Sequence, residues 1–285
     1  MALQSNRRLA PRVEAYLADV VRACAEHDAA MHSVVLFGSS TTGGYSGGVS
    51  DVDLLLVLRD GTGAAERDRT RDMMSELEAR HGIGKPLSHE QGALERFADR
   101  IMANDRAFFV CTRADLLSGE PGRIFGVPSA QAWFVDRVTI PSIVATAVTV
   151  WGEELLNQVP LLPIRRLDVG KALFAHSNQV LFSAGLYPLL PSATKYAMDA
   201  LKRSVHNCYF CYHGRPAKLS EEVEFFLRRH GRIRALDRLM ALRSDYHRSF
   251  GFVLSCLPTL LLLHVHTARD NRFPRDARPR EGEAP

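Results

Sequence analysis

The sequence predicts an α+β protein in which a small sheet flanked by helices is followed by an all-helical part. Two apolar strands, near residues 34–37 and 51–58, enclose a loop rich in Gly, Ser and Thr. Helical and strand patterns alternate around these strands. From about residue 139 onward the apolar periodicity becomes helical. Together these observations favour a mixed α+β unit followed by helices.

The elements follow from apolar spacing and from Gly and Pro breaks. Residues 10–29 have helical spacing, so a helix precedes the first strand. Beyond the second strand we expect helices over 64–80 and 91–103 and a strand over 108–112. The helices expected in the second half cover residues 140–158, 166–186, 191–213, 220–230 and 232–266.

A long connection punctuated by Gly and Pro places a domain boundary near residue 128. The sequence therefore predicts a catalytic domain over residues 1–128 and a helical domain over 129–267. Residues 268–285 contain Pro and mixed charges but few apolar side chains, so we expect a disordered tail.

Composition excludes several classes of protein. The chain has 285 residues, 46% apolar, which is enough for one large or two medium domains. Five scattered cysteines and a charged N-terminal stretch do not fit a secreted disulfide scaffold or a signal peptide, so a cytoplasmic location is expected. The net charge of +4 is compatible with nucleotides but far from a dense Lys/Arg stripe, so a nucleic-acid partner is not expected.

The longest apolar run, residues 251–263, is shorter than a membrane span and contains Pro258. We therefore predict buried helix ends around a bend, and no membrane partner.

The most informative residues lie between the first two strands. Gly38 permits a sharp turn, and successive amides from Ser39 onward can form an anion nest at the start of a short helix. Because side chains alternate along a strand, Asp51 and Asp53 point the same way while Val52 faces the core. Two adjacent carboxylates repel each other unless a divalent cation neutralises them. The pattern suits a nucleoside triphosphate with magnesium.

This pattern resembles the signature of the DNA polymerase β-like nucleotidyltransferase superfamily: an apolar residue, Gly-Ser, a spacer, then alternating acidic and apolar residues. The matching residues are Phe37, Gly38, Ser39, Asp51, Val52, Asp53 and Leu54. The loop contains no Gly-Lys-Ser or Gly-Lys-Thr, so it is not a Walker A element. The resemblance implies a nucleotidyltransferase core with a small mixed sheet. A helical domain behind such a core is the layout of aminoglycoside and other small-molecule nucleotidyltransferases.

The resemblance also implies a reaction. A nucleoside monophosphate, AMP favoured, passes from ATP or another triphosphate to a hydroxyl or amine of a small-molecule acceptor, and pyrophosphate leaves. Asp51 and Asp53 would be the catalytic ligands of Mg²⁺. The Gly38 amide and the Ser39 hydroxyl would hold the triphosphate, with Ser40 as a neighbour.

Active members usually have a third carboxylate on a later strand. The strand predicted over 108–112 contains no acid, and Asp115 follows its end. Glu90 is therefore the catalytic candidate, with His89 as a possible base. An alternative is that Glu90 complements the dipole of a helix capped by Ser88.

Four polar residues follow one face of the helix predicted over 191–213, namely Lys195, Asp199, Lys202 and His206. The resemblance implies that Lys195 and Lys202 meet the triphosphate, and Asp199 could deprotonate an acceptor. The alternative is a solvated face of charge pairs.

Three functions remain open. The large helical half favours a small-molecule nucleotidyltransferase. A second possibility is a protein-modifying nucleotidyltransferase of a toxin–antitoxin type. The missing third acid favours a nucleotide-binding regulator without turnover. The sequence carries no signal of the oligomeric state.

Overall fold

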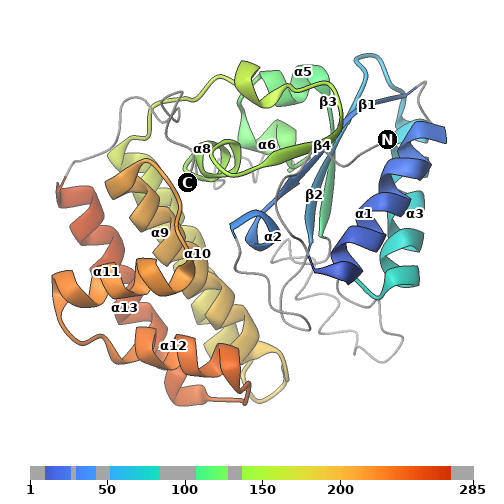
Figure 1. Cartoon of the computed structure of the whole chain (residues 1–285). Helices are drawn as coiled ribbons and strands as arrows, with labels where there is room; N and C mark the ends of the chain where they lie inside the picture. Colours follow the sequence, from blue (N-terminus) through green and yellow to red (C-terminus); the bar gives the residue numbers. More distant parts are fainter. Residues whose placement is uncertain (1–9, 27–29, 43–51, 84–106, 128–136, 271–285) are drawn as a thin grey trace. The chain divides into compact units, whose positions relative to one another are not determined.

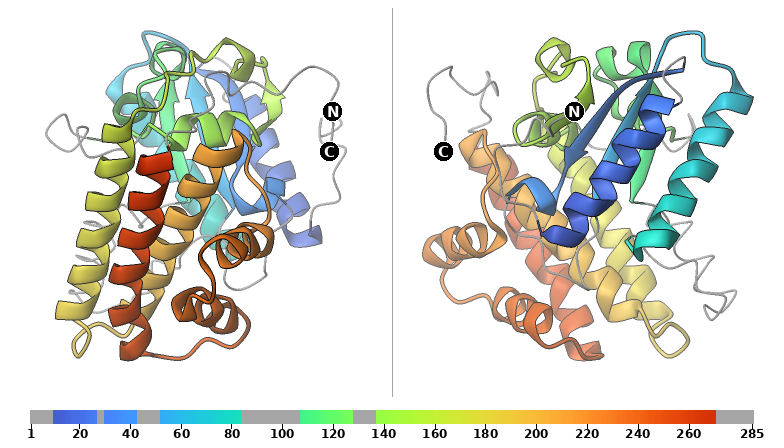
Figure 2. Two further views of the ribbon diagram at one scale, coloured as in Figure 1. Left: turned by 90° about the vertical axis from the view of Figure 1, so that its left-hand side faces the viewer. Right: turned by 45° about the vertical axis from the view of Figure 1, so that its right-hand side comes forward.

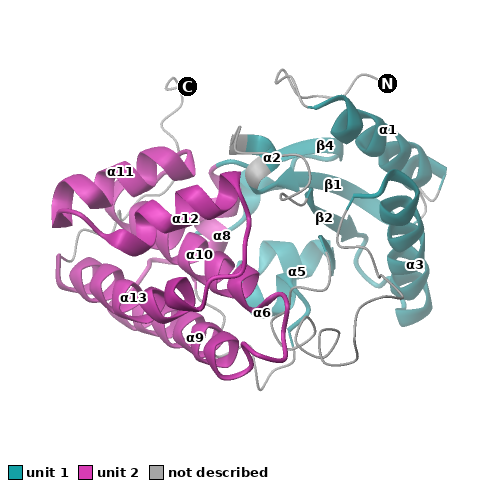
Figure 3. Cartoon of the chain, turned by 90° about the horizontal axis from the view of Figure 1, so that it is seen from below, with its two compact units in different colours: residues 1–92, 99–132, 146–161 teal, residues 93–98, 133–145, 162–285 magenta. Residues whose placement is uncertain are grey.

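A computed structural model of the chain describes residues 10–26, 30–42, 52–83, 107–127 and 137–270. The chain divides into two compact units (Figure 3). The first unit contains the sheet and comprises residues 1–92, 99–132 and 146–161. The second unit is helical and comprises residues 93–98, 133–145 and 162–285. Each unit is described separately below.

The first unit is built on a four-stranded mixed sheet with the order β3-β2-β1-β4 (Figure 1). Strand β1 is antiparallel to both β2 and β4, whereas β2 and β3 are parallel. The strands are β1 (Met31–Phe37), β2 (Asp53–Leu58), β3 (Phe108–Thr112) and β4 (Val148–Gly152). The predicted small mixed sheet is confirmed.

Helices α1 (Pro11–Glu26) and α3 (Ala64–His81) lie side by side (Figure 2). They form one core with residues of β1 and β2, including Leu36 and the fully buried Leu54. Helix α3 ends where Gly82 adopts a left-handed φ of 56°. Both predicted helices are confirmed within a few residues. The shorter elements of this unit are α2 (Ser39–Thr42), α5 (Arg113–Leu117), α6 (Pro121–Ile124) and η1 (Leu156–Gln158).

Strand β4 corrects the prediction of a helix over residues 140–158. Helix α8 (Thr139–Val144) ends early, and the β-branched run that follows pairs with β1, Val35 opposite Thr149. Residues 146–161 consequently belong to the sheet unit rather than to a continuous helical domain. The boundary predicted near residue 128 and the helix predicted over 91–103 lie outside the described residues.

The second unit packs five helices around one apolar core that includes Phe226 and Phe252. The helices are α9 (Arg166–Gly185), α10 (Ala193–His213), α11 (Leu219–His230), α12 (Arg234–Ser244) and α13 (Phe250–Asp270). The prediction of one helical stretch over 232–266 is wrong, because the chain divides before α13. Ser249 Oγ accepts a hydrogen bond from the amide of Phe252 at 3.3 Å and caps the new helix.

Helix α13 is continuous over 21 residues, which corrects the prediction that two helix ends meet near Pro258. The side chain of Pro258 lies on the exposed side of the helix, and packing on α9 and α10 outweighs the cost of the lost backbone hydrogen bond. By length and composition alone α13 could cross a membrane, a property shared by core helices of soluble proteins. The helix extends through Asp270, past the predicted domain end at 267, and residues 271–285 lie outside the described part.

Two histidines are buried where α9, α10 and α13 meet. His176 Nδ1 lies 2.7 Å from Ser204 Oγ, and His264 Nδ1 donates to the carbonyl of Val169 at 3.2 Å. The two rings are 5.9 Å apart. Burial lowers the pKa of His264 to about 4 and holds the pKa of His176 well below its ordinary value. Both imidazoles are therefore neutral in the folded protein near neutral pH.

We expect these histidines to make the helical unit acid-sensitive. Their folded pKa values lie below the unfolded value of 6.5, so their contribution to stability is present above pH 6.5. This contribution is lost as the pH falls toward 4. His264 alone accounts for about 3 kcal/mol of the free energy of unfolding. Denaturant unfolding followed by circular dichroism should show a smaller acid loss for His264→Asn than for wild type. The exposed His247→Asn should behave as wild type, and equal acid losses in all three would contradict the assignment.

Candidate functional site

The site begins where β1 ends. Gly38 follows the last strand residue with a φ of 76°, a conformation that other residues adopt only with strain. The turn is closed by Thr41, whose amide and hydroxyl both donate to the Gly38 carbonyl, at 3.2 and 2.9 Å. Helix α2 starts at Ser39, as the predicted anion nest requires. Sequence reasoning overlooked Thr41, although a Thr that closes a turn on the residue three earlier is a readable signal.

Asp53 lies directly against this turn. It is the first residue of β2 and pairs with Phe37 across the antiparallel ladder. A Cβ atom built on Gly38 would stand 2.1 Å from Asp53 Oδ2. Only a glycine leaves room for the carboxylate here, so Gly38 is required both by its φ and by this close approach.

The strand alternation around Asp53 agrees with the sequence prediction. Val52 is fully buried, whereas Asp53 is partly exposed. Asp51 lies outside the described residues, so its position beside Asp53 stays a prediction. Within the described part of the chain, no cluster of three or more His, Cys, Asp or Glu side chains is arranged to hold a metal.

Ser40 supplies a further polar atom beside the turn. Its side chain is buried, and its Oγ has no hydrogen-bond partner among the described residues. A buried hydroxyl without a partner costs about 1–3 kcal/mol. A ligand oxygen would satisfy it, which fits the predicted place of Ser40 near a triphosphate.

Strand β3 brings no acid to Asp53. The amide of Leu54 donates to the Ala107 carbonyl at 2.9 Å, and Leu55 pairs with Phe109. Ala107, the residue before β3, and Phe109 of β3 are therefore the neighbours on the face that carries Asp53. The Phe109 ring contacts Phe37, 6.3 Å away between centroids. The sequence showed that this strand lacks an acid, and the register shows that an aromatic side chain stands beside Asp53 instead.

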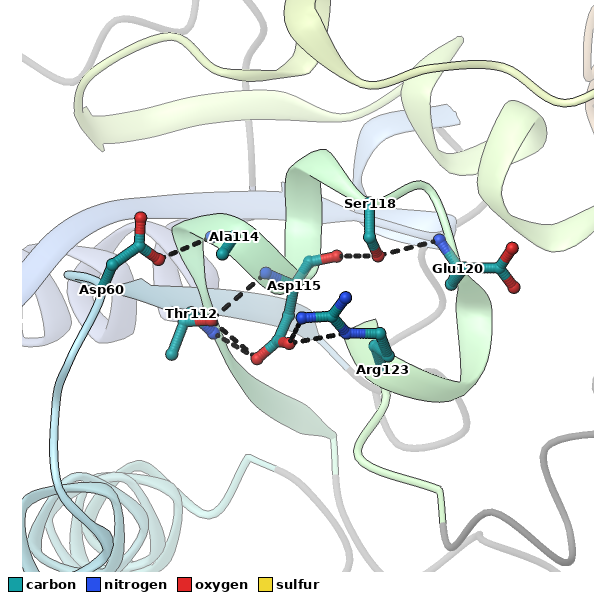
Figure 4. Close-up of polar contacts among 7 residues, drawn as sticks. All are labelled: Asp60, Thr112, Ala114, Asp115, Ser118, Glu120 and Arg123. Carbon is teal, nitrogen blue, oxygen red and sulfur yellow. Dashed lines mark hydrogen bonds and ion pairs between the residues drawn. The ribbon is translucent and has the colours of Figure 1, made fainter.

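Asp115 lies past the end of β3 that is away from Asp53, and its polar contacts are drawn in Figure 4. It follows β3, so about five residues of strand, roughly 15 Å, separate it from the level of Asp53. Its carboxylate closes a capping box with Thr112 and pairs with Arg123 at 2.9 Å. Burial raises the pKa of Asp115, but the hydrogen bonds from Thr112 and Arg123 outweigh it and hold the pKa below its ordinary value. Asp115 is a helix cap.

The remaining acid candidate, Glu90, and its neighbours Ser88 and His89 lie outside the described residues. Neither the catalytic nor the helix-end interpretation of Glu90 is tested by the fold.

The α10 candidates belong to the helical unit. Lys202 Nζ lies 3.1 Å from Asp199, which also pairs with Arg203 at 2.5 Å. Lys195 is exposed one turn before Asp199, and His206 pairs with the fully buried Glu222 of α11. Lys202 and Asp199 therefore form the charge pair that the alternative interpretation expects. A role of Lys195 and Lys202 at the triphosphate stays a prediction, because they lie in the other unit from Gly38 and Asp53.

Comparison with known proteins agrees with this geometry. Residues 17–90 match the model of a family described as nucleotidyltransferase domain, and the matched segment contains both Gly38 and Asp53. No curated protein matches the chain. The site and the mixed sheet thus define a nucleotidyltransferase domain of the DNA polymerase β-like type.

Among the solved structures that are similar to the chain, one matches most of its length. It is the crystal structure of the spectinomycin adenyltransferase AAD(9) from Enterococcus faecialis with ATP and spectinomycin. The TM-score is 0.55 with 11% sequence identity, and the match covers 90% of this chain and 99% of that chain. The two proteins share a fold. The family match over residues 17–90 supports nucleotidyl transfer.

The close approach of Gly38 and Asp53 makes a specific prediction. Gly38→Ala and Gly61→Ala both place a Cβ at a left-handed φ, which costs about 1–2 kcal/mol. The Cβ at Gly61 meets open space, whereas the Cβ at Gly38 displaces the Asp53 carboxylate. Calorimetric titration with ATP and Mg²⁺ should therefore show a loss of affinity for Gly38→Ala of at least about tenfold. Gly61→Ala should bind as wild type, and equal affinities in both variants would contradict the close approach.

Proposed function

We propose that the protein transfers AMP from ATP to a hydroxyl or amine of a small-molecule acceptor and releases pyrophosphate. The observation that carries this proposal is the Asp53 carboxylate held against the Gly38 backbone at the end of β1. A carboxylate beside a glycine turn and an unsatisfied Ser40 hydroxyl offers hard oxygen ligands for a cation next to donors for phosphate.

These residues fit a divalent cation. Asp53, together with Asp51, would hold Mg²⁺, and the Gly38 amide, the Ser39 hydroxyl and Ser40 would hold the triphosphate. The cation, when bound, supplies neutralisation of the charge on the phosphates. The contribution of the chain is to orient the triphosphate for in-line attack, because phosphate transfer depends mainly on positioning and electrostatics.

The reaction forms one bond and breaks one. An acceptor oxygen or nitrogen attacks the α-phosphorus, the bond from that phosphorus to the bridging oxygen of the β-phosphate breaks, and pyrophosphate leaves. The proton of the acceptor passes to a carboxylate, for which we propose Glu90. Lys195 and Lys202 are proposed to contact the triphosphate.

The choice of acceptor and nucleotide rests on fold similarity. The similar structure is an adenyltransferase with ATP and spectinomycin, and the likeness extends over the helical half as well as the core. This supports ATP and a small-molecule acceptor for the present chain. A cytoplasmic location is proposed with it, since all five cysteines lie in the described part, are buried and form no disulfide.

A regulator that binds nucleotide without turnover is a second candidate. It is favoured by Ala107, just before β3, and Phe109 of β3, the apolar residues beside Asp53. The two functions differ in one measurable property. An enzyme binds ATP and transfers its nucleotidyl group, whereas a regulator binds ATP and transfers nothing.

The test of nucleotidyl transfer uses ATP labelled at the α-phosphate and, in a parallel reaction, ATP labelled at the γ-phosphate. Both are offered with a panel of small hydroxyl and amine acceptors. We expect the α-label, and no γ-label, on the acceptor. Asp53→Asn should lose at least about 100-fold in rate, because it removes a preorganised charge at the reacting phosphates.

Asp60→Asn is the matched control. Asp60 lies past the other end of β2, accepts a hydrogen bond from the Ala114 amide at 2.7 Å, and should tolerate the amide. Transfer of the γ-label would exclude nucleotidyl transfer. If the protein binds ATP but transfers neither label, and Glu90→Gln binds ATP with the same affinity, the result would favour the regulator.

A further inference from the structure

The helical unit carries an apolar surface that its own described residues leave uncovered. All the strongly exposed large hydrophobic residues in the described part of the chain belong to this unit, and most of them lie on α9 and α13. Six of them, each between 46% and 62% exposed, define what we call the α9–α13 face. They are Leu167, Phe174 and Leu181 of α9 and Leu254, Leu261 and Val265 of α13.

The two helices that form this face are antiparallel neighbours (Figure 2). His264 of α13 contacts Val169 near the start of α9, and Phe250 at the start of α13 contacts Tyr187 just past the end of α9. This pairing puts Leu181 level with Leu254 and Phe174 level with Leu261. The six side chains therefore form three successive levels across two adjacent helices.

The spacing along each helix places these side chains on one stripe, because seven residues are close to two full turns. The three α9 residues are seven positions apart, and so are Leu254 and Leu261. Gly170 and Gly185 are exposed on α9, and a Cβ at either would meet nothing within 4 Å. Large side chains at heptad intervals beside glycines provide both the knobs and the holes that close helix packing needs.

The area of the face is large for a monomer surface. Half of a large apolar side chain presents roughly 90 Å², so the six residues present about 500 Å², near the upper range of apolar patches on monomers. A stable dimer buries about 800 Å² per partner, of which the apolar centre is the larger part. Exposed neighbours such as Asn178 and Pro258 are available to supply the rim.

We propose that the α9–α13 face is the interface of a homodimer in which two copies of this chain pack α9 and α13 against each other. A face of this kind is self-complementary, as a two-fold interface requires, because each copy presents the same levels of large side chains and the same glycine gaps. The roughly 500 Å² of apolar surface matches the apolar share, somewhat over half, of the area that one partner of a stable dimer buries. The second copy is therefore the occupant that the pattern fits.

The test is the mass of the full chain in solution by light scattering and sedimentation. We expect twice the 31.7 kDa monomer mass at micromolar concentration. Phe174→Glu and Leu261→Glu, made separately, should each weaken dimerisation at least about tenfold, because a charge at the centre of the interface is desolvated without a partner. Tyr246→Glu is the control, since Tyr246 is as exposed as Leu261 but lies outside the face.

Thermal unfolding checks that the variants are folded, and Phe174→Gln or Leu261→Gln replaces the glutamate variant at the same position if that variant does not fold. A monomeric wild type, or variants that dimerise as wild type does, would overturn the proposal. Cosedimentation of a monomeric wild type with phosphatidylglycerol vesicles would overturn it in favour of a lipid surface.

Discussion

The site depends on one steric constraint, the contact between the Asp53 carboxylate and the α-carbon of Gly38. The antiparallel pairing of β1 with β2 brings Phe37 opposite Asp53, so the residue that follows Phe37 must make room for the carboxylate. Glycine does so and also accepts the left-handed φ of the turn. The backbone of the turn and the carboxylate are consequently held together by the pairing of β1 and β2, the two central strands of the sheet.

The same sheet explains what the site lacks. Strand β3 is parallel to β2, and the residues at the level of the site are Ala107, just before β3, and Phe109 of β3. The first described acid after β3, Asp115, lies at the other end of the strands. It forms a capping box with Thr112 and an ion pair with Arg123. A carboxylate that serves as base must therefore come from a segment other than β3. The Glu90→Gln substitution therefore separates an enzyme that uses Glu90 as its base from a protein that only binds nucleotide.

Local sequence signals predicted much of this architecture, and long-range pairing accounts for most of the errors. The glycine turn and the acid-apolar-acid pattern identified Gly38 and Asp53, and apolar periodicity identified α1, α3, α9, α10 and α11. Strand β4 was missed because its five residues become a strand only by pairing with β1, more than a hundred residues earlier. The aromatic neighbour of Asp53 depends on the register of β3, which no local pattern fixes. By contrast, the break before α13 had a readable signal in the cap residue Ser249.

The most direct measurement is the binding of Mn²⁺ in the presence of ATP, followed by electron paramagnetic resonance of the free ion. Mn²⁺ prefers the same oxygen ligands as Mg²⁺ and reports its own binding without any acceptor or turnover. If Asp53 and the Gly38 turn together hold a metal–triphosphate, wild type should sequester Mn²⁺ more strongly with ATP than without it. Asp53→Asn should lose that gain, whereas Asp60→Asn should retain it. Equal sequestration by wild type and Asp53→Asn would contradict the account.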